Sequence, residues 1–250
     1  MASLLSDVKT MVRDPTLGTL RLLNRVYRHA ANGDRRPAFH DIDRICPGLR
    51  LLDRNYSVIR EEMEGVLGQP ARIPRYHEIS PRETYISGTV DAEKAWRVFM
   101  LVTPVGVPRT NQARCPRTTA LIRQVPNVIQ AFFSILDPGK SIPAHSGDNM
   151  GYLRYHLGLR VPENNPPSIR VKDQLHTWAE GQSVVFDDSW EHEVYNRSDA
   201  LRAVLIVDFF RPMPWPAHAL NKLAVRGLPR YSEEAKQALE QIEKFAQDGG

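Results

Sequence analysis

Two histidines in the second half of the chain have the surroundings expected of metal ligands. His145 follows a turn punctuated by glycine and proline, and His192 comes shortly after the apolar run Ser183–Phe186. Neutral imidazoles at the ends of paired strands suit iron, nickel or zinc. An isolated histidine is more often an ordinary polar residue, but the flanking turns favour a shared site. We therefore take His145 and His192 as candidate ligands of one metal ion.

Two arginines lie on predicted strand faces where a charge is unexpected. On one strand, alternation places Arg154 and His156 on the same face, opposite a row of apolar side chains. On another strand, Arg202 shares its face with Val204 and Ile206. Inside a barrel, an arginine on such a face needs an anionic partner, so Arg202 indicates a bound carboxylate.

These candidate site residues fall in a segment with the pattern of a β-protein. Short β-branched and aromatic runs, separated by turn residues, fill the segment 128–215 and are typical of an all-β barrel or sandwich. The predicted strands are 128–136, 151–159, 168–171, 183–186 and 201–210.

Helical patterns flank this β-rich segment. Apolar residues recur at helical spacing over 1–35, with a break at Pro15 and Gly18, and again over 55–68. A last helix is expected to begin after an N-cap at Ser232 and to pack on the outside of the barrel. Ordinary docking onto the core is favoured for the first helical stretch, and a membrane-surface role is the alternative.

The 250 residues are predicted to form a single domain. Its mixed, helix-rich part covers 1–127 and includes a buried strand at 96–102 and a short helix at 116–122. The β-rich core covers 128–215, and a helical extension covers 216–250.

Composition and charge indicate which classes of partner and which cellular location to expect. The net charge is +4 without a Lys/Arg block, so nucleic acid is not the expected partner. No run of 18 apolar residues is present, and charged residues interrupt the N-terminus, so neither a membrane span nor a signal peptide is predicted. Cys46 and Cys115 are expected to be free thiols. These features predict a soluble, cytoplasmic protein, with the oligomeric state left open.

The segment 133–214 resembles the aspartyl/asparaginyl β-hydroxylase family of iron(II)/2-oxoglutarate-dependent oxygenases. Weaker similarity extends back to about Ile79, as in bacterial members that include lipid A hydroxylases. The resemblance implies a mainly β, double-stranded β-helix (jelly-roll or cupin-like) fold with flanking helices. The matching stretches are Phe-Ser-Ile-Leu-Asp-Pro-Gly (133–139), Pro-Ala-His-Ser-Gly (143–147), Leu-Arg-Tyr-His-Leu-Gly-Leu (153–159), Trp-Ala-Glu-Gly (178–181), Phe-Asp-Asp-Ser-Trp-Glu-His-Glu-Val (186–194) and 202–208.

The resemblance also implies roles for these residues. His145 and His192 would bind Fe(II), and Ser134 with Arg202 would hold the distal carboxylate of the cosubstrate 2-oxoglutarate. Arg154 and His156 would line the same pocket near the other end of the cosubstrate, with Arg154 contributing to catalysis. The implied reaction uses O2 to hydroxylate an unactivated C–H bond.

The position of the usual third ligand differs from most iron/2-oxoglutarate oxygenases, as it does throughout the resembled family. Most iron/2-oxoglutarate oxygenases carry a carboxylate two residues after the first histidine, whereas this chain has Gly147 there. Asp148 is expected to assist the metal ligands and not to bind the metal itself.

The substrate is less well defined by the sequence. Tyr152 replaces an arginine that animal members acting on proteins tend to carry, which argues against a peptidyl aspartate. A small molecule, an amino acid or a peptide-type substrate is expected, with a lipid acyl chain as the alternative. A cupin-like metal-binding protein without 2-oxoglutarate chemistry and a non-catalytic interaction module are the other readings.

Overall fold

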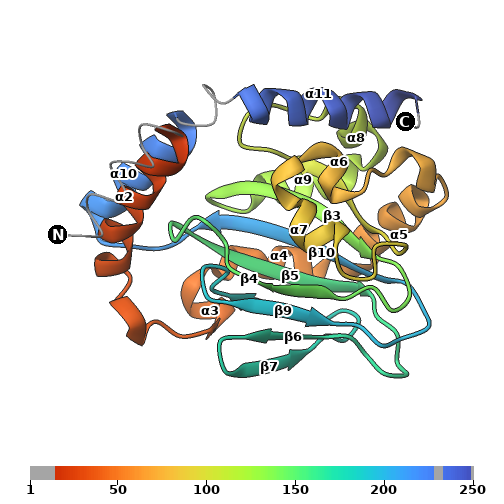
Figure 1. The fold of residues 1–250 in the computed structure, drawn as a ribbon, viewed down its shortest axis with the longest axis horizontal. Helices are drawn as coiled ribbons and strands as arrows, with labels where there is room; N and C mark the ends of the chain where they lie inside the picture. Colours follow the sequence, from red (N-terminus) through yellow and green to blue (C-terminus); the bar gives the residue numbers. More distant parts are fainter. Residues whose placement is uncertain (1–14, 228–232, 249–250) are drawn as a thin grey trace.

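Two antiparallel sheets form the centre of the protein (Figure 1). The computed structural model describes residues 15–227 and 233–248. The larger sheet has the order β1-β8-β5-β10-β3-β2, and the smaller has the order β4-β9-β6-β7. The strands are β1 (Phe39–His40), β2 (Trp96–Val102), β3 (Val128–Leu136), β4 (Ile142–His145), β5 (Tyr152–Arg160), β6 (Ser168–Val171), β7 (Gln174–Thr177), β8 (Ser183–Phe186), β9 (His192–Tyr195) and β10 (Arg202–Phe210).

Strands β3 to β10 pass back and forth between the sheets, so the chain winds into the predicted jelly roll. The first passage uses the turn at Asp137-Pro138-Gly139. Proline at the second turn position and Gly139 at φ 70° suit a type II turn, which the Lys140 N–H closes by donating to the Asp137 carbonyl at 3.0 Å. This turn leads the chain into β4, which ends at His145.

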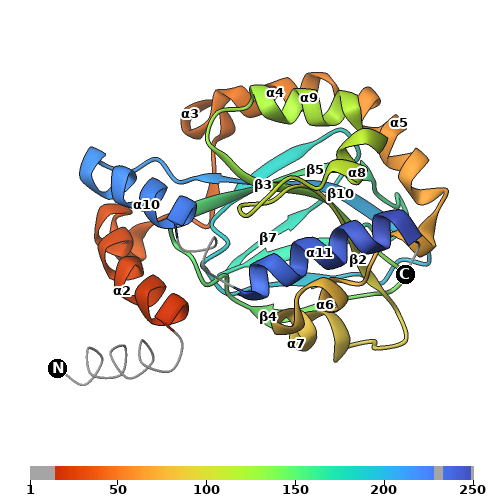
Figure 2. The same cartoon turned by 90° about the horizontal axis from the view of Figure 1, so that it is seen from above.

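Helices surround the two sheets. Helices α3, α4, α5 and α9 cover the outer face of the larger sheet, while α6, α7 and α11 lie on the other side (Figure 2). Helix α11 packs on α6 and α8. The helices are α2 (Pro15–Ala30), α3 (Ile42–Ile45), α4 (Arg50–Arg54), α5 (Tyr56–Leu67), α6 (Tyr76–Ile79), α7 (Thr84–Gly88), α8 (Arg109–Arg114), α9 (Pro116–Gln124), α10 (Trp215–Gly227) and α11 (Glu233–Asp248).

The larger sheet separates two hydrophobic clusters. Leu205 and Val207 of β10 point outward and pack under α3, α4, α5 and α9. Val204 and Ile206 point the other way, into the lumen between the sheets, where Val194 of the smaller sheet also lies. This alternation is the one predicted for 201–210, and it fixes the direction of every polar side chain on the same strand.

Several element boundaries differ from the sequence-based expectation. The break expected at Gly18 is wrong, because α2 begins at Pro15 and continues through that glycine. Proline is tolerated there because the first helical turn needs no donor from it. The strands β4, β7 and β9 were not predicted as strands, since each has a single large aliphatic side chain, whereas β6 and β8 of the same length have two. Ser232 lies outside the described residues.

Two further expectations concern cysteines and membrane spans. Cys46 and Cys115 are buried and free, as predicted. In the described part of the chain, no helix has both the length and the apolar character needed to cross a bilayer.

Candidate active site

The two predicted metal ligands face each other across the smaller sheet. His145 on β4 pairs in register with His192 on β9, and their ring centroids are 4.2 Å apart. The Nδ1 of His145 lies 2.8 Å from the Pro143 carbonyl, and the Nδ1 of His192 lies 2.9 Å from the Trp190 carbonyl. A carbonyl only accepts, so each Nδ1 carries the proton and each Nε2 presents a lone pair. This is the arrangement of metal-binding histidines.

Burial favours the neutral form of His145, which is the form that binds a metal cation. The pKa of His145 is lowered to about 4, first by burial and then by the neighbouring His192. The imidazole of His145 is therefore neutral at physiological pH. Neutral imidazole is the form that binds a metal, so no proton needs to be removed from His145 first.

A carboxylate missed by the sequence reasoning lies beside the histidines. Asp188 is 1% exposed, and its Oδ1 is 3.3 Å from the Nε2 of His192. A Cβ added at Gly147 would lie 2.0 Å from the Oδ2 of Asp188. Asp188 thus fills the space that a side chain at position 147 would need. Asp148, in contrast, is exposed at the pocket mouth.

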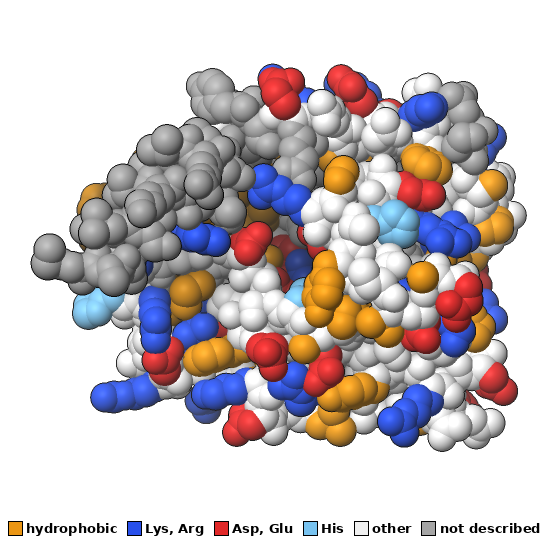
Figure 3. Space-filling view, viewed as in Figure 1, with side chains coloured by type: hydrophobic (Ala, Val, Ile, Leu, Met, Phe, Trp, Pro, Cys, Tyr) orange, Lys and Arg blue, Asp and Glu red, His pale blue; other side chains and the backbone are white. Residues whose placement is uncertain are grey.

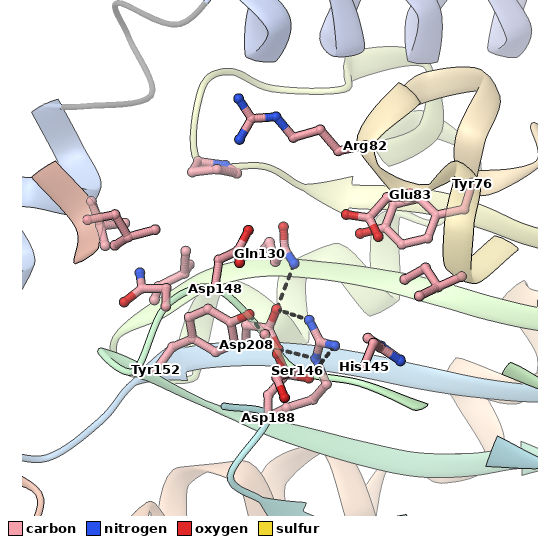
Figure 4. A pocket seen from close by; sticks show the side chains of 18 of the residues that line it. Tyr76, Arg82, Glu83, Gln130, His145, Ser146, Asp148, Tyr152, Asp188 and Asp208 are labelled. Carbon is pink, nitrogen blue, oxygen red and sulfur yellow. Dashed lines mark hydrogen bonds and ion pairs between the residues drawn. The ribbon is translucent and has the colours of Figure 1, made fainter. Parts of the chain in front are cut away.

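Arg154 joins Asp188 to a second buried carboxylate (Figure 4). Its Nη1 donates to Asp188 at 2.6 Å, and its Nε and Nη2 donate to Asp208 at 2.7 and 2.9 Å. Asp208 is the cross-strand partner of Arg154 on β10. Gln130 donates to Asp208 at 2.6 Å, and the Tyr152 hydroxyl donates to Asp188 at 2.8 Å. The chain itself therefore satisfies the charge of Arg154.

The pKa values of this cluster follow from burial and ion pairing. Burial alone would lower the pKa of Arg154, but the two carboxylates hold it well above its usual value. Burial alone would raise the pKa of Asp188, but Arg154 and His192 together bring it below its usual value. Asp188 is therefore an anion next to the histidine pair.

Arg202 has the opposite environment. It is 1% exposed, and within the described residues no carboxylate forms an ion pair with it. Its Nη1 donates to the Ser134 hydroxyl at a long 3.4 Å, its guanidinium lies 4.0 Å from the Trp178 ring centroid, and its Nε has no partner. Burial lowers the pKa of Arg202 to about 9. A buried cation with open donors is a site for an anion.

The neighbours of Arg202 also have unused polar groups. The Ser134 hydroxyl accepts from Trp96 Nε1 at 3.0 Å and from Arg202, so its own proton is left to donate. Both ring nitrogens of His156 and the Nε1 of Trp178 are buried without a partner. Such groups are costly unless a ligand or water satisfies them.

Aromatic rings connect the histidine pair to Arg202. Phe186 lies 5.8 Å from His192 and 4.9 Å from His156, between ring centroids. His156 stacks at 5.7 Å on Trp178, which in turn lies under Arg202. Burial, followed by the nearby arginines, lowers the pKa of His156 well below its usual value, so this ring is neutral. The lumen thus has a two-imidazole end and a cationic end joined by a ring-lined wall.

A cavity of about 470 Å³ opens onto the histidine end. Figure 3 shows a hollow near the centre of one face, with basic, acidic and histidine side chains inside it. His145, Asp188, Arg154 and Tyr152 line its inner part. Its outer walls come from α2, α7, α10 and the start of β3 and are largely apolar: Leu20, Ile86, Ile129, Ala224 and Val225.

The structure brings the six predicted site residues to the inner faces of strands. His145 and Arg154 line the open cavity, while Ser134 and Arg202 lie deeper, beyond Trp96. The predicted grouping of Arg154 with His156 on one strand face is confirmed, but Arg154 is already ion-paired. Among the described residues, no group of three His, Cys, Asp or Glu side chains is arranged to hold a metal.

Fold and site together define a jelly-roll protein with a two-histidine centre in its lumen. Comparison with known proteins gives the family: the model of the aspartyl/asparaginyl beta-hydroxylase family matches residues 53–212. The chain belongs to the aspartyl/asparaginyl beta-hydroxylase family, as the sequence motifs indicated, and its relatives are hydroxylases.

Two relatives show the range of the family. The ornithine lipid ester-linked acyl 2-hydroxylase of Rhizobium tropici is 38% identical over 205 residues, which cover 78% of this chain and 72% of that protein. The human aspartyl/asparaginyl beta-hydroxylase is 30% identical over 172 residues, 66% of this chain but only 21% of that protein.

Solved structures that align with part of this chain include cupin domains. The Cupin_2 domain of an XRE family transcriptional regulator from Enterobacter cloacae aligns with 33% of this chain and 82% of its own, at 16% identity and a TM-score of 0.28. The Schizosaccharomyces pombe Cnp3 cupin domain aligns with 34% and 57%, at 8% identity and a TM-score of 0.29.

Proposed function

We propose that the protein is an iron(II)- and 2-oxoglutarate-dependent hydroxylase. The observation that carries the proposal is the buried, unpaired Arg202 in the same lumen as the two Nε2 lone pairs of His145 and His192. A metal site alone would not need a buried cation. A dicarboxylate with one end at the metal and the other at Arg202 accounts for both.

Each residue of the lumen then has a role. His145 and His192 would hold iron(II), and Arg202 with the Ser134 hydroxyl would hold the distal carboxylate of 2-oxoglutarate. His156 and Trp178 offer further polar groups along the connecting wall. The chemistry that the bound iron and cosubstrate supply is oxidation of a C–H bond by O2, coupled to the conversion of 2-oxoglutarate into succinate and CO2.

Arg154 and Asp188 are proposed to position the metal site. Arg154 holds Asp188 next to His192 through a 2.6 Å ion pair, and Tyr152 fixes the other oxygen of the same carboxylate. A fixed anion beside the two imidazoles favours a divalent cation between them. Because two carboxylates already neutralise Arg154, it is not a free receptor for an acidic substrate.

We propose an acyl chain of a lipid as the substrate, which is the alternative that the sequence left open. The outer pocket wall is largely apolar, and Arg154 is occupied, so a chain of CH2 groups fits this cavity better than an aspartyl side chain. The similarity to an ornithine lipid acyl hydroxylase over most of both chains supports the same choice.

Substrate-stimulated succinate formation tests the proposal. Purified enzyme with iron(II), ascorbate and 2-oxoglutarate should form succinate and a product that has gained one oxygen atom when given an ester-linked acyl amino-acid lipid. An aspartyl peptide and free amino acids serve as competing substrates. His192→Ala should abolish both products. Succinate formation stimulated only by the peptide would contradict the lipid assignment, and iron binding without 2-oxoglutarate binding would favour a cupin-like protein of another function.

A further inference from the structure

Helices α2 and α10 form a basic pair at one side of the molecule. They lie side by side in Figure 1 and contact each other. Neither helix contains an aspartate or glutamate, whereas α2 carries three arginines and α10 carries a lysine and an arginine. Two packed helices without a single acidic residue differ from an ordinary solvated surface, where both signs are mixed.

The same helices expose large hydrophobic side chains. The described residues leave ten large hydrophobic side chains exposed, and five of them lie on these two helices. Trp215 is 80% exposed and Leu223 is 71% exposed, which is unusual for side chains of their size. The five residues are Leu22, Val26, Trp215, Leu220 and Leu223.

We infer that α2 and α10 form an interfacial docking surface for an anionic lipid bilayer. Exposed leucine and tryptophan beside arginine and lysine, on helices too short and too polar to span a membrane, are the composition of helices that lie in the plane of the bilayer surface. Anionic headgroups complement Lys222 and Arg226 of α10, which an apolar protein partner would leave unmatched.

The opposite faces of the same helices belong to the candidate active site. Leu20 and Tyr27 of α2, and Ala224 and Val225 of α10, line the cavity above the histidine pair. A bilayer that holds the outer faces of the helices is therefore separated from the catalytic pocket by the helices themselves. This part of the inference, that the docked bilayer is the source of the acyl chain, rests on the proposed lipid hydroxylation.

Asparagines tie the helix pair to the loop after His145. Asn24 of α2 donates to the Asp148 carbonyl at 2.6 Å and accepts from the Met150 N–H at 3.0 Å. Asn221 of α10 is buried and donates to the Gly151 carbonyl. Both helices thus hold the loop that forms one rim of the pocket, and docking them on a surface brings that rim near the bilayer.

Vesicle flotation with the full-length protein tests the surface. The probes are vesicles of phosphatidylcholine alone and of phosphatidylcholine mixed with phosphatidylglycerol. Wild-type protein should float with the mixed vesicles. Leu220→Gln/Leu223→Gln should reduce binding at least about tenfold, because both leucines lose their apolar contact with lipid. Leu175→Gln is the matched control, since Leu175 is 63% exposed on β7, far from α10.

The contribution of positive charge to vesicle binding is tested with separate variants. Arg226→Gln on α10 should weaken binding to the mixed vesicles about fivefold, whereas Arg197→Gln, an exposed arginine outside the helix pair, should not. Absence of wild-type binding to the mixed vesicles, equal binding to both vesicle types, or an equal loss in Leu175→Gln would overturn the inference. So would self-association through this surface in place of vesicle binding.

The readouts separate this inference from the proposed reaction. Vesicle binding requires neither iron nor turnover. Leu220 and Leu223 do not line the cavity, so the double variant should keep full succinate formation on a detergent-dispersed lipid and lose it only on vesicles. A protein that binds vesicles but makes no succinate would refute the proposed function and leave the docking surface intact.

Discussion

Replacing Arg202 with methionine is expected to stabilise the protein free of metal and 2-oxoglutarate, while abolishing its binding of 2-oxoglutarate. Burial lowers the pKa of Arg202 to about 9, which corresponds to about 5 kcal/mol for keeping the charge in the interior. The ring of Trp178 and the long hydrogen bond to Ser134 offset about 3 kcal/mol of that. A penalty of about 2 kcal/mol remains, and methionine removes it with little change of shape.

Thermal unfolding of chelator-treated protein at pH 7 measures the effect. The folded-state pKa of Arg202 lies below its unfolded-state value, so the penalty is fully present below pH 9 and fades as the pH rises through that value. About 2 kcal/mol corresponds to a midpoint about 4 to 8 °C higher in a chain of this size. Anaerobic addition of iron(II) and 2-oxoglutarate should then raise the wild-type midpoint further and leave that of Arg202→Met at its iron-only value.

Arg211→Met is the matched control, because Arg211 is equally buried but paired. Its Nη2 lies 2.7 Å from Asp187, so its removal leaves that buried carboxylate with Arg36 as its remaining arginine partner and should destabilise by about 2 kcal/mol. Substitution by methionine should thus raise the free energy of unfolding at Arg202 and lower it at Arg211. A lower midpoint for empty Arg202→Met, or undiminished stabilisation by 2-oxoglutarate, would refute the assignment of Arg202 as an anion receptor.

Three further predictions concern the metal site and the acid limb of stability. Asp188→Asn should weaken iron binding about 10- to 100-fold in a competition assay, whereas Asp148→Asn should change it less than about twofold; equal losses would contradict the assignment. Gly147→Asp should lower iron affinity and not add a ligand, because its Cβ would collide with Asp188, and tighter binding would refute this. Burial lowers the pKa of His40 to about 4, so the free energy of unfolding should fall by up to about 3 kcal/mol as the pH drops from 6.5 towards 4. His40→Asn should make this fall shallower when unfolding midpoints are measured against pH. An unchanged pH dependence in the variant would contradict the role of His40.

The long strands and their faces could be predicted from the sequence. Alternation over nine residues places Arg154 with His156, and Arg202 with Val204, because one apolar face must pack under the outer helices. The strands β4 and β9 of the smaller sheet could not be predicted in this way, although His145 and His192 lie on them. The turns beside the two histidines and the motif similarity, and not periodicity, predicted the pair as ligands.

The role of Asp188 could not be read from its surroundings in the sequence. It depends on the register of β4 with β9 and on Asp188 filling the place of a side chain at Gly147, which only the folded sheet defines. The spacing of four residues between Asp188 and His192 was a usable signal. The pairing of Arg154 with Asp208 likewise depends on the register of β5 with β10. The sequence indicates that Arg154 needs an anionic partner, but not that the protein itself supplies one.

The direct opposition of His145 and His192 has a mechanical consequence. Strands β5 to β8 all lie in the loop of chain between these two residues, so a metal bound by both would act as a removable cross-link that closes the loop. Such a cross-link fastens β4 to β9, whereas β10 is held at the centre of the larger sheet by two strand neighbours and needs none. Metal should therefore slow hydrogen exchange chiefly in the smaller sheet, which makes that sheet the part of the fold that reports whether the enzyme is loaded.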